Sequence, residues 1–307
     1  MTLAPIALFV YRRLAHTATA VEALVRNPEA QDTDLVVFSD AARDAASQAD
    51  VAKVRSYIRS ISGFRSTNVV ERSANLGLAN SIMDGVSRLC CERGSVIVIE
   101  DDLVVAPGFL EFMNAALIRY RDEEKVMQVS GYMFPVKHPE ALKPIFLTRV
   151  PTSWGWATWD RAWKSMELDA CALFDRLKKA NALHDFDVAG SYIYSEMLQR
   201  QAAGELDSWA IRWYASMFLA GGLCVRPSGS LVANTGFDDT GVHCGTMTAF
   251  DVTLSKAIPL EFPKVIQEDE RAIESMAEFF RAIRPSWLRL VLSSVKQRLR
   301  GATHLRR

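Results

Sequence analysis

The sequence predicts an α/β protein in which helices cover both faces of a mostly parallel β-sheet. Two observations predict this fold class. Short apolar runs alternate with segments of helical apolar spacing over the first half of the chain, and three of the apolar runs end directly in polar or charged residues. No internal repeat and no low-complexity segment interrupts that order.

The expected elements alternate between strand and helix along the chain. In chain order they are a strand at 5–10, a helix at 17–26, a strand at 35–38, a helix at 41–59, a short strand at 68–71, a helix at 76–89, a strand at 96–99 and a helix from Pro107 to about residue 120. Strands that are joined by helices in this way run parallel to one another.

Polar side chains follow three of the expected strands at the point where each strand ends. Arg12 follows the first strand, Asp40 the second, and Glu100, Asp101 and Asp102 the fourth. Because ligands of open α/β sheets bind at the carboxyl ends of the strands, we expect these groups to converge on one ligand site.

Composition excludes several classes of protein. The chain has 307 residues, 49% of them hydrophobic, which is enough to bury a sizeable core. Basic and acidic residues balance at 36 each, so no overall positive field favours nucleic acid as a partner. The five cysteines have no C-x-x-C spacing, which argues against a disulfide framework and a cysteine zinc site, and favours a reducing compartment.

The apolar N-terminal stretch LAPIALFVY is not expected to be a signal peptide. No basic residue precedes it, and Arg12, Arg13 and His16 separate it from the small-residue triplet at 18–20, which reverses the usual order. No uninterrupted apolar run approaches the roughly 18 residues that span a bilayer. We therefore expect a cytoplasmic protein.

Three adjacent carboxylates at 100–102 repel one another and need water or a cation. Carboxylate and phosphate oxygens are the ligands that Mg²⁺ and Mn²⁺ prefer, and a strand-end acidic cluster suits such a site. The alternative is a solvated acidic turn beside the helix that begins near Pro107, where carboxylates are favourable in any case. The triplet alone leaves both readings open.

The segment VIVIEDDLVVAPGFLEFMN resembles the acidic, D-x-D-equivalent motif of GT-A-fold glycosyltransferases, of the N-acetylglucosaminyltransferase I kind and their bacterial polysaccharide-biosynthesis relatives. Seven further segments resemble that family in order: IALFVYRR, LVVFSD, NLGLANSI, VSGYMFPV, SWGWATWDRAW, DSWAIRW and NTGFDDTGVHC. They extend over residues 5 to 250. The resemblance implies a GT-A fold, a Rossmann-like mixed sheet flanked by helices.

The resemblance implies a role for each strand-end residue. Asp102 would bind Mn²⁺ or Mg²⁺ that bridges the diphosphate of a nucleotide sugar, a uridine diphosphate sugar by family likeness, and Asp101 and Glu100 would face the ribose and the donor sugar. Arg12 and Asp40 match positions that hold the nucleotide. The alternatives are a surface salt bridge for Arg12 and a helix N-cap for Asp40.

Three further residues are donor-site candidates by the same resemblance. Asn75 lies near the nucleotide, Trp156 lies near the donor sugar, and His243 in the loop FDDTGVHCG could donate to the diphosphate when the loop closes. The alternatives are a helix cap for Asn75, a core position for Trp156, and an ordinary loop histidine for His243.

The resemblance also implies an inverting reaction, in which one carboxylate takes the proton of the acceptor hydroxyl. We expect Asp207 to be this base, because DSWAIRW matches the family's acidic segment next to tryptophan. The family has two consecutive acids there, so Glu205 is the second candidate. The alternative for Asp207 is a cap of the helix that starts near Ser208.

The expected organisation is a GT-A domain over 1–265, with a nucleotide-sugar-binding half at 1–130 and an acceptor-side half at 131–265, followed by a helical basic tail at 266–307. Apolar residues of the tail recur at helical spacing between basic ones. Such an amphipathic helix could contact the inner face of the cytoplasmic membrane, where a lipid-linked acceptor would lie; the alternative is that it packs on the domain.

The function expected from the resemblance is metal-dependent transfer of a hexosyl or N-acetylhexosaminyl group to a glycan or lipid-linked acceptor in polysaccharide assembly. Two alternatives stay open. One is a carbohydrate-binding or scaffold protein that kept the fold and lost turnover. The other is a sugar nucleotidyltransferase, which would need a glycine-rich phosphate loop where this chain has Tyr11-Arg12-Arg13-Leu14-Ala15.

Overall fold

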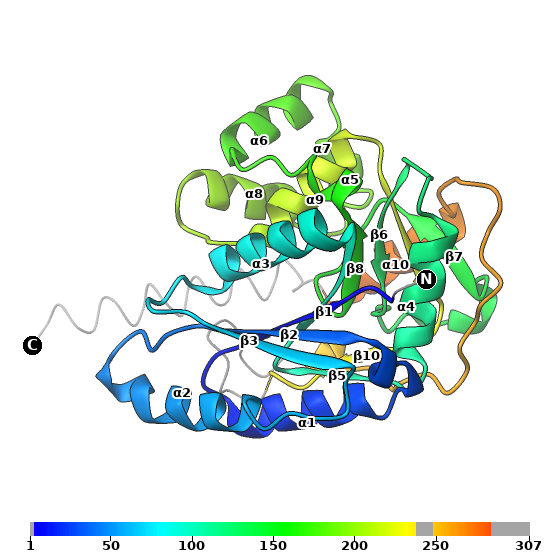
Figure 1. Ribbon diagram of the computed structural model, residues 1–307. Helices are drawn as coiled ribbons and strands as arrows, with labels where there is room; N and C mark the ends of the chain where they lie inside the picture. Colours follow the sequence, from blue (N-terminus) through cyan, green and yellow to red (C-terminus); the bar gives the residue numbers. More distant parts are fainter. Residues whose placement is uncertain (1–2, 238–247, 284–307) are drawn as a thin grey trace, which may run out of the picture.

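The computed structural model describes residues 3–237 and 248–283. Within these ranges an eight-stranded mixed sheet has the order β3-β2-β1-β4-β8-β6-β9-β7 and is flanked by helices on both faces (Figure 1). Its strands are β1 (Ile6–Val10), β2 (Asp34–Ser39), β3 (Ser66–Glu71), β4 (Ser95–Glu100), β6 (Val126–Ser130), β7 (Ile145–Thr148), β8 (Trp156–Trp159) and β9 (Leu223–Pro227). The predicted fold class, a mixed α/β sheet flanked by helices, is confirmed.

Helices connect the strands and extend the second half of the chain. They are α1 (Leu14–Val25), α2 (Ala45–Ile58), α3 (Leu78–Arg93), α4 (Phe109–Arg119), α5 (Asp160–Trp163), α6 (Ala170–Lys179), α7 (Leu183–Phe186), α8 (Tyr194–Ala202), α9 (Trp209–Leu219) and α10 (Glu270–Ile283). A separate two-stranded sheet pairs β5 (Leu103–Val105) with β10 (Val232–Asn234).

The sheet is parallel on one side and mixed on the other. β3, β2, β1 and β4 all run parallel, whereas β8 is antiparallel to both of its neighbours, β4 and β6. β9 runs parallel to β6, and the edge strand β7 is antiparallel to β9. The carboxyl ends of β1, β2 and β4 therefore meet at one edge, as the sequence predicted.

The strand sequences explain why the sheet is an inner layer. Every residue of β1 (IALFV) and of β2 (DLVVFS) is buried, and a continuous apolar run of this kind is typical of strands covered on both faces. On one face, α1, α2 and α4 pack on β1, β2 and β4 through residues such as Leu24, Val54 and Phe112. On the other, α3, α5 and α9 pack through Ile82, Trp163 and Trp213.

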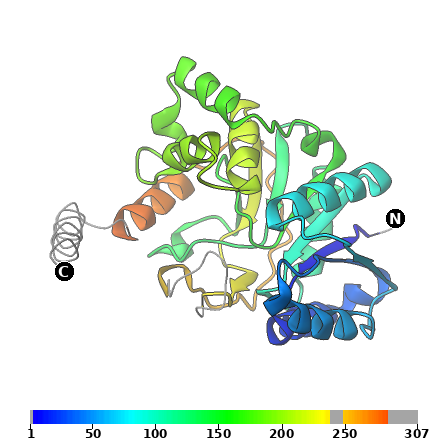
Figure 2. The same ribbon diagram turned by 90° about the vertical axis from the view of Figure 1, so that its left-hand side faces the viewer.

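The two expected halves of the domain share this core. Residues of β1, β2, β6, β7 and β9 belong to one hydrophobic cluster, and β8 joins β4 to β6 without a break in the sheet. The helices α6, α7 and α8 add a smaller cluster against α9, and both views show this green segment well apart from the blue N-terminal strands (Figures 1 and 2).

The segment expected to begin the basic tail is part of the domain. α10 buries Ala272, Met276 and Phe280 in the main cluster, and the ring of Phe280 lies 4.9 Å from that of Phe134. The expected boundary at residue 265 therefore does not coincide with a boundary of the hydrophobic core. The rest of the expected amphipathic helix, 284–307, lies outside the described residues. Among the described helices, none combines the length and the hydropathy that a bilayer crossing requires.

An ion pair ties the edge strand β3 to β2 at the start of both strands. Arg65 Nε and Nη2 donate to the two carboxylate oxygens of Asp34 at 2.9 and 2.5 Å, and the Ser66 hydroxyl donates to the same carboxylate at 2.6 Å. These hydrogen bonds favour the charged form and hold the pKa of Asp34 at about 2.

We predict that Asp34→Asn lowers the free energy of unfolding by about 2 kcal/mol at neutral pH. Because the folded-state pKa is depressed, this stabilisation is present above the unfolded value of about 3.9 and is lost as the pH falls towards about 2. Urea unfolding of both proteins across that range measures the difference.

The exposed Asp50, paired with Lys53 on α2, provides the control Asp50→Asn, which should change stability little. A difference between wild type and Asp34→Asn that does not shrink on acidification would contradict the electrostatic explanation.

Candidate active site

The acidic triplet lies at the carboxyl end of β4, between the strand and the short β5. Glu100 is the last residue of β4 and stands opposite Phe9 of β1, and Asp101 and Asp102 form the turn into β5. β1 in turn pairs Val10 with Ser39, next to Asp40. The parallel register thus brings three polar strand ends to one edge.

The cation that meets the triplet is Arg13. Its Nη2 donates to Asp101 Oδ1 at 2.5 Å and to Asp102 Oδ2 at 2.8 Å. Burial opposes the charge on Arg13, but the charges of Asp101 and Asp102 outweigh it and raise the pKa of the guanidinium. Arg13 Nη1 is buried and has no hydrogen-bond partner among the described residues. One donor of this cation is therefore available to a ligand.

Arg12, the arginine singled out from the sequence, does not reach the carboxylates. It is exposed, and its guanidinium carbon lies 5.9 Å from the ring centroid of Tyr11. The turn between β1 and α1 directs Arg13 towards Asp101 instead. The resemblance covered both arginines in IALFVYRR, but nothing in the sequence gave the direction of either side chain.

The carboxyl groups of the triplet differ in environment. Burial, followed by the charges of Asp102 and Asp101, raises the pKa of Glu100 well above its usual value. Burial also raises the pKa of Asp101, although Arg13 and a backbone hydrogen bond from Tyr11 oppose the rise. Asp101 and Asp102 together outnumber the single charge of Arg13, which makes the cluster receptive to a further cation.

A neighbouring segment of the chain packs on Asp102. The backbone oxygen of Asp102 accepts hydrogen bonds from Thr235 N at 2.8 Å and from Thr235 Oγ1 at 3.0 Å, because β10 pairs with β5. Gly236 follows, and a Cβ at this position would lie only 2.3 Å from Asp102 Oδ2. A side chain at this position would crowd the Asp102 carboxylate, so glycine favours the close approach.

Asp40 and Asn75 hold the neighbouring loops together. The buried Asp40 carboxylate accepts hydrogen bonds from the backbone N–H groups of Ala41, Leu76 and Gly77, each at 2.9 Å. Asn75 Nδ2 donates to the Ala41 carbonyl at 2.7 Å. Neither residue caps a helix, since the side chain of Asp44 caps α2 and α3 begins after Gly77. Their predicted contact with a nucleotide stays a prediction.

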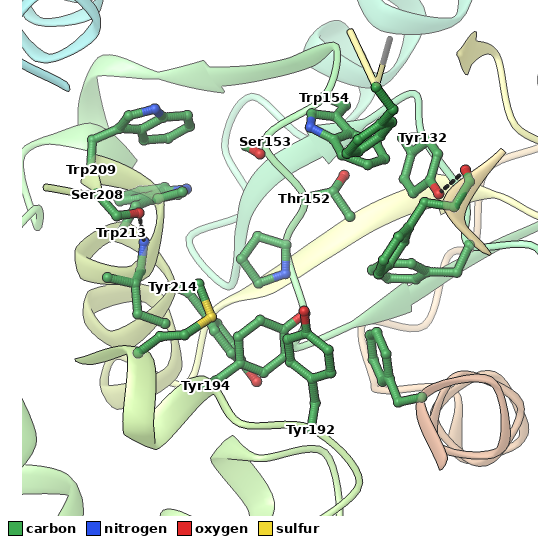
Figure 3. Close-up of a pocket in the computed structure, with 18 residues that line it drawn as sticks. Tyr132, Thr152, Ser153, Trp154, Tyr192, Tyr194, Ser208, Trp209, Trp213 and Tyr214 are labelled. Atoms are coloured by element: carbon green, nitrogen blue, oxygen red, sulfur yellow. Dashed lines mark hydrogen bonds between the residues drawn. The ribbon is translucent and has the colours of Figure 1, made fainter. Parts of the chain in front are cut away.

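An aromatic cavity of about 390 Å³ lies beside this edge (Figure 3). Eleven of the 18 described residues that line it are aromatic, and none of the 18 is charged. Trp154 and Trp209 lie on opposite sides of its upper part, and Tyr192 and Tyr194 lie at the lower end. Phe237 joins the cavity to the acidic cluster, because it follows Gly236 and its ring lies 5.5 Å from that of Trp154.

Trp156 is a core residue, so the prediction that its ring contacts the donor sugar is corrected. Its side chain is 0% exposed and stacks on Trp209 at 4.9 Å, with Trp163 at 5.7 Å on another side. No face of the ring is open to a ligand. Trp154, which lines the cavity, is the tryptophan placed to stack on a sugar.

Asp207 lies at the start of α9 with 66% of its side chain exposed, and its Oδ1 is 3.7 Å from Arg212 Nη2. Ser208, rather than Asp207, caps α9: its hydroxyl accepts from Ile211 N. Ser208 also lines the cavity, so Asp207 lies beside a lining residue. The second candidate, Glu205, is equally exposed and lies 3.7 Å from Arg200. His243 lies outside the described residues.

The residues of the cluster fit a hard divalent cation. Among the described residues no group of three or more His, Cys, Asp or Glu side chains is arranged as a complete metal site. A magnesium or manganese ion commonly needs only one or two protein carboxylates, because phosphate and water oxygens supply the rest. Asp101 and Asp102 provide such oxygens, and the unpaired Arg13 Nη1 beside them suits a phosphate oxygen.

No family model matches the chain, and no curated protein matches it. Solved structures that are similar to it at low identity include the following three. The mannosyltransferase PcManGT from Pyrobaculum calidifontis, in complex with GDP-Man and Mn²⁺, is 14% identical with a TM-score of 0.38, over 71% of this chain and 74% of that one.

The other two are structures of S. aureus TarS. TarS 1–349 is 12% identical with a TM-score of 0.42, over 77% of this chain and 61% of that one. A second TarS structure is 13% identical with a TM-score of 0.41, over 76% of this chain and 36% of that one. At these identities and TM-scores the similarity assigns no role to any residue of this chain.

We predict that Glu100→Gln increases the free energy of unfolding at about pH 8. Because the folded-state pKa of Glu100 is raised, its ionisation destabilises the fold as the pH rises above the unfolded value of about 4.3. The glutamine amide has no such ionisation, so it removes that penalty. The increase in the free energy of unfolding should therefore vanish at about pH 4. Thermal unfolding at both pH values measures it.

The exposed Glu278 of α10 gives the control Glu278→Gln, for which no such gain is expected. A loss of stability in Glu100→Gln at the higher pH would show that the carboxylate is needed for the fold.

Proposed function

We propose that this protein is a glycosyltransferase that takes a nucleoside diphosphate sugar as its donor. The observation that carries the proposal is the strand-end cluster, in which two carboxylates of the acidic triplet pair with one arginine whose Nη1 has no partner among the described residues. A metal diphosphate complements this arrangement, because it offers positive charge to the carboxylates and phosphate oxygens to Arg13.

Asp102, supported by Asp101, would hold Mn²⁺ or Mg²⁺. The ion, when bound, supplies positive charge that stabilises the departing diphosphate. Arg13 adds a donor to the same charge, and its ion pairs with both aspartates fix its position before the donor binds. Glu100, whose pKa is raised, would stay protonated and donate a hydrogen bond to a hydroxyl group of the donor sugar.

The nucleotide would lie along the loops after β1 and β2. Asp40 and Asn75 rigidify these loops through backbone hydrogen bonds, and the exposed Arg12 beside Tyr11 is free to meet the ribose or the base. Uridine is the base that the family resemblance suggests. His243, which lies outside the described residues, is proposed to donate to the diphosphate.

The acceptor, a glycan or a lipid-linked sugar, would lie in the aromatic cavity. Trp154 offers an aromatic face for the apolar side of a sugar ring. Asp207, beside the cavity residue Ser208, would take the proton of the attacking hydroxyl. One base and one displacement give inversion at the anomeric carbon.

We predict that Asp102→Asn reduces release of nucleoside diphosphate from the preferred donor by about 10²- to 10³-fold, because the charge that holds the metal diphosphate is lost. A panel of uridine and guanosine diphosphate sugars is tested with Mn²⁺ and with chelator, and nucleotide binding is measured by calorimetry on the same samples. Chelator added to the wild-type protein should reduce release as much as the substitution does.

Asp122→Asn, at an exposed aspartate distant in sequence from the cluster, is the control and should leave release unchanged. Nucleotide sugar binding without transfer to any acceptor would favour the carbohydrate-binding alternative. Absence of metal-dependent nucleotide binding would contradict the proposed function.

A further inference from the structure

A charged side chain without a counterion is buried behind the aromatic cavity. Arg226, in β9, is 0% exposed, and its Nη2 donates to the carbonyl of Val150. The Nε and Nη1 atoms are also buried, and neither has a hydrogen-bond partner among the described residues. Arginine keeps its proton in proteins, so this is a buried positive charge.

Such a charge is costly to the fold unless an anion offsets it. An arginine that follows the neighbouring strand shows the usual solution: Arg149, just after β7, is paired with Glu268 at 2.7 Å. Arg226 has no ion pair of this kind within the described residues. A functional role therefore explains its burial in the sheet interior better than a contribution to stability does.

The guanidinium lies directly behind the wall of the cavity. Its central carbon is 5.8 Å from the ring centroid of Phe134, and Val150, which accepts its hydrogen bond, precedes Pro151. Phe134 and Pro151 both line the cavity, whereas Arg226 itself does not. Phe134 and Pro151 therefore lie between the guanidinium and the cavity.

The residues that line the cavity offer no charged group of their own to this cation. None of the described lining residues is charged, and Arg226 acts on the lining hydroxyl of Tyr132 together with the opposing charge of Asp251. The charge of Arg226 reaches the lining hydroxyls, since it acts against the rise that burial causes in the pKa of Tyr194. The hydroxyls of Tyr192 and Tyr194 have no recorded hydrogen bond within the described part of the chain, so both can serve a ligand (Figure 3).

We propose that the cavity binds an acceptor that carries an oxyanion, a carboxylate or a phosphate, and that Arg226 selects for this charge. The ring of the acceptor would pack against Trp154 or Trp209, and its anionic group would lie at the Tyr192 and Tyr194 end, on the side of Arg226. That the bound compound is the acceptor of the transfer rests on the proposed function. That the cavity binds an anionic ring compound does not depend on it.

The test uses three 4-nitrophenyl β-D-glucosides that differ only at carbon 6, which carries a hydroxymethyl group, a carboxylate or a phosphate. Calorimetric titration into the full chain without nucleotide should show one or both anionic glucosides binding about tenfold more tightly than the neutral one. The carboxylate and phosphate arms distinguish the two sources of negative charge.

Two substitutions assign the preference to Arg226. Arg226→Met keeps the length and removes the charge, and should reduce the difference between anionic and neutral glucosides to less than about twofold. Arg226→Lys should retain most of it. The control is Arg161→Met, at a half-buried arginine whose donors are taken by the carbonyls of Arg121, Tyr120 and Val126.

Thermal unfolding of the free protein adds a second measurement. Because Arg226→Met removes an uncompensated buried charge, its melting temperature should equal or exceed that of wild type. Addition of the anionic glucosides should raise the melting temperature of wild type only. Equal affinity of the unmutated protein for the charged and neutral glucosides would overturn the proposal without any variant. An anion preference that survives in Arg226→Met would also overturn it.

These outcomes are separate from those of the donor experiment. Donor-dependent release of nucleotide together with no anion preference would reject this inference and leave the proposed function intact. Anion binding that depends on Arg226, without metal-dependent nucleotide binding, would retain the site and reject the proposed function.

Discussion

Repulsion among the carboxylates of Glu100, Asp101 and Asp102 is the constraint on which the candidate site depends. The strand geometry places them together at the end of β4, and a single cation, Arg13, holds two of them. Arg13 comes from the turn after β1, so the ion pairs also fix the relation between β1, α1 and β4. The arrangement stores negative charge at a strand end that an added cation can relieve.

The sequence predicted the parts of the fold that follow from periodicity. The apolar runs before residues 11, 40 and 100 are strands, their ends meet, and the intervening helical patterns are helices. These predictions succeeded because burial on both faces leaves a continuous apolar signal in a strand. The antiparallel entry of β8 into the sheet carries no such signal, because strand direction depends on the path of the chain between strands.

Side-chain direction was the main limit on predicting the site. Trp154 and Trp156 are two residues apart, which would place them on the same face of a regular strand, but Gly155 between them has φ +58° and breaks that alternation. Trp154 therefore faces the cavity while Trp156 is buried. The cavity itself has no sequence signature, because its lining comes from segments between residues 132 and 280 that meet only in the folded chain.

The two parts of the site are linked through residues 235 to 237. Thr235 is bound to the backbone of Asp102, Gly236 touches its carboxylate, and Phe237 packs on Trp154 in the cavity wall. A change at the Asp102 side chain is therefore felt first at Gly236, and a change at Phe237 is felt first by the same three-residue segment. If the cluster binds the donor and the cavity the acceptor, as proposed, this short connection would couple the two sites with no contact between the ligands.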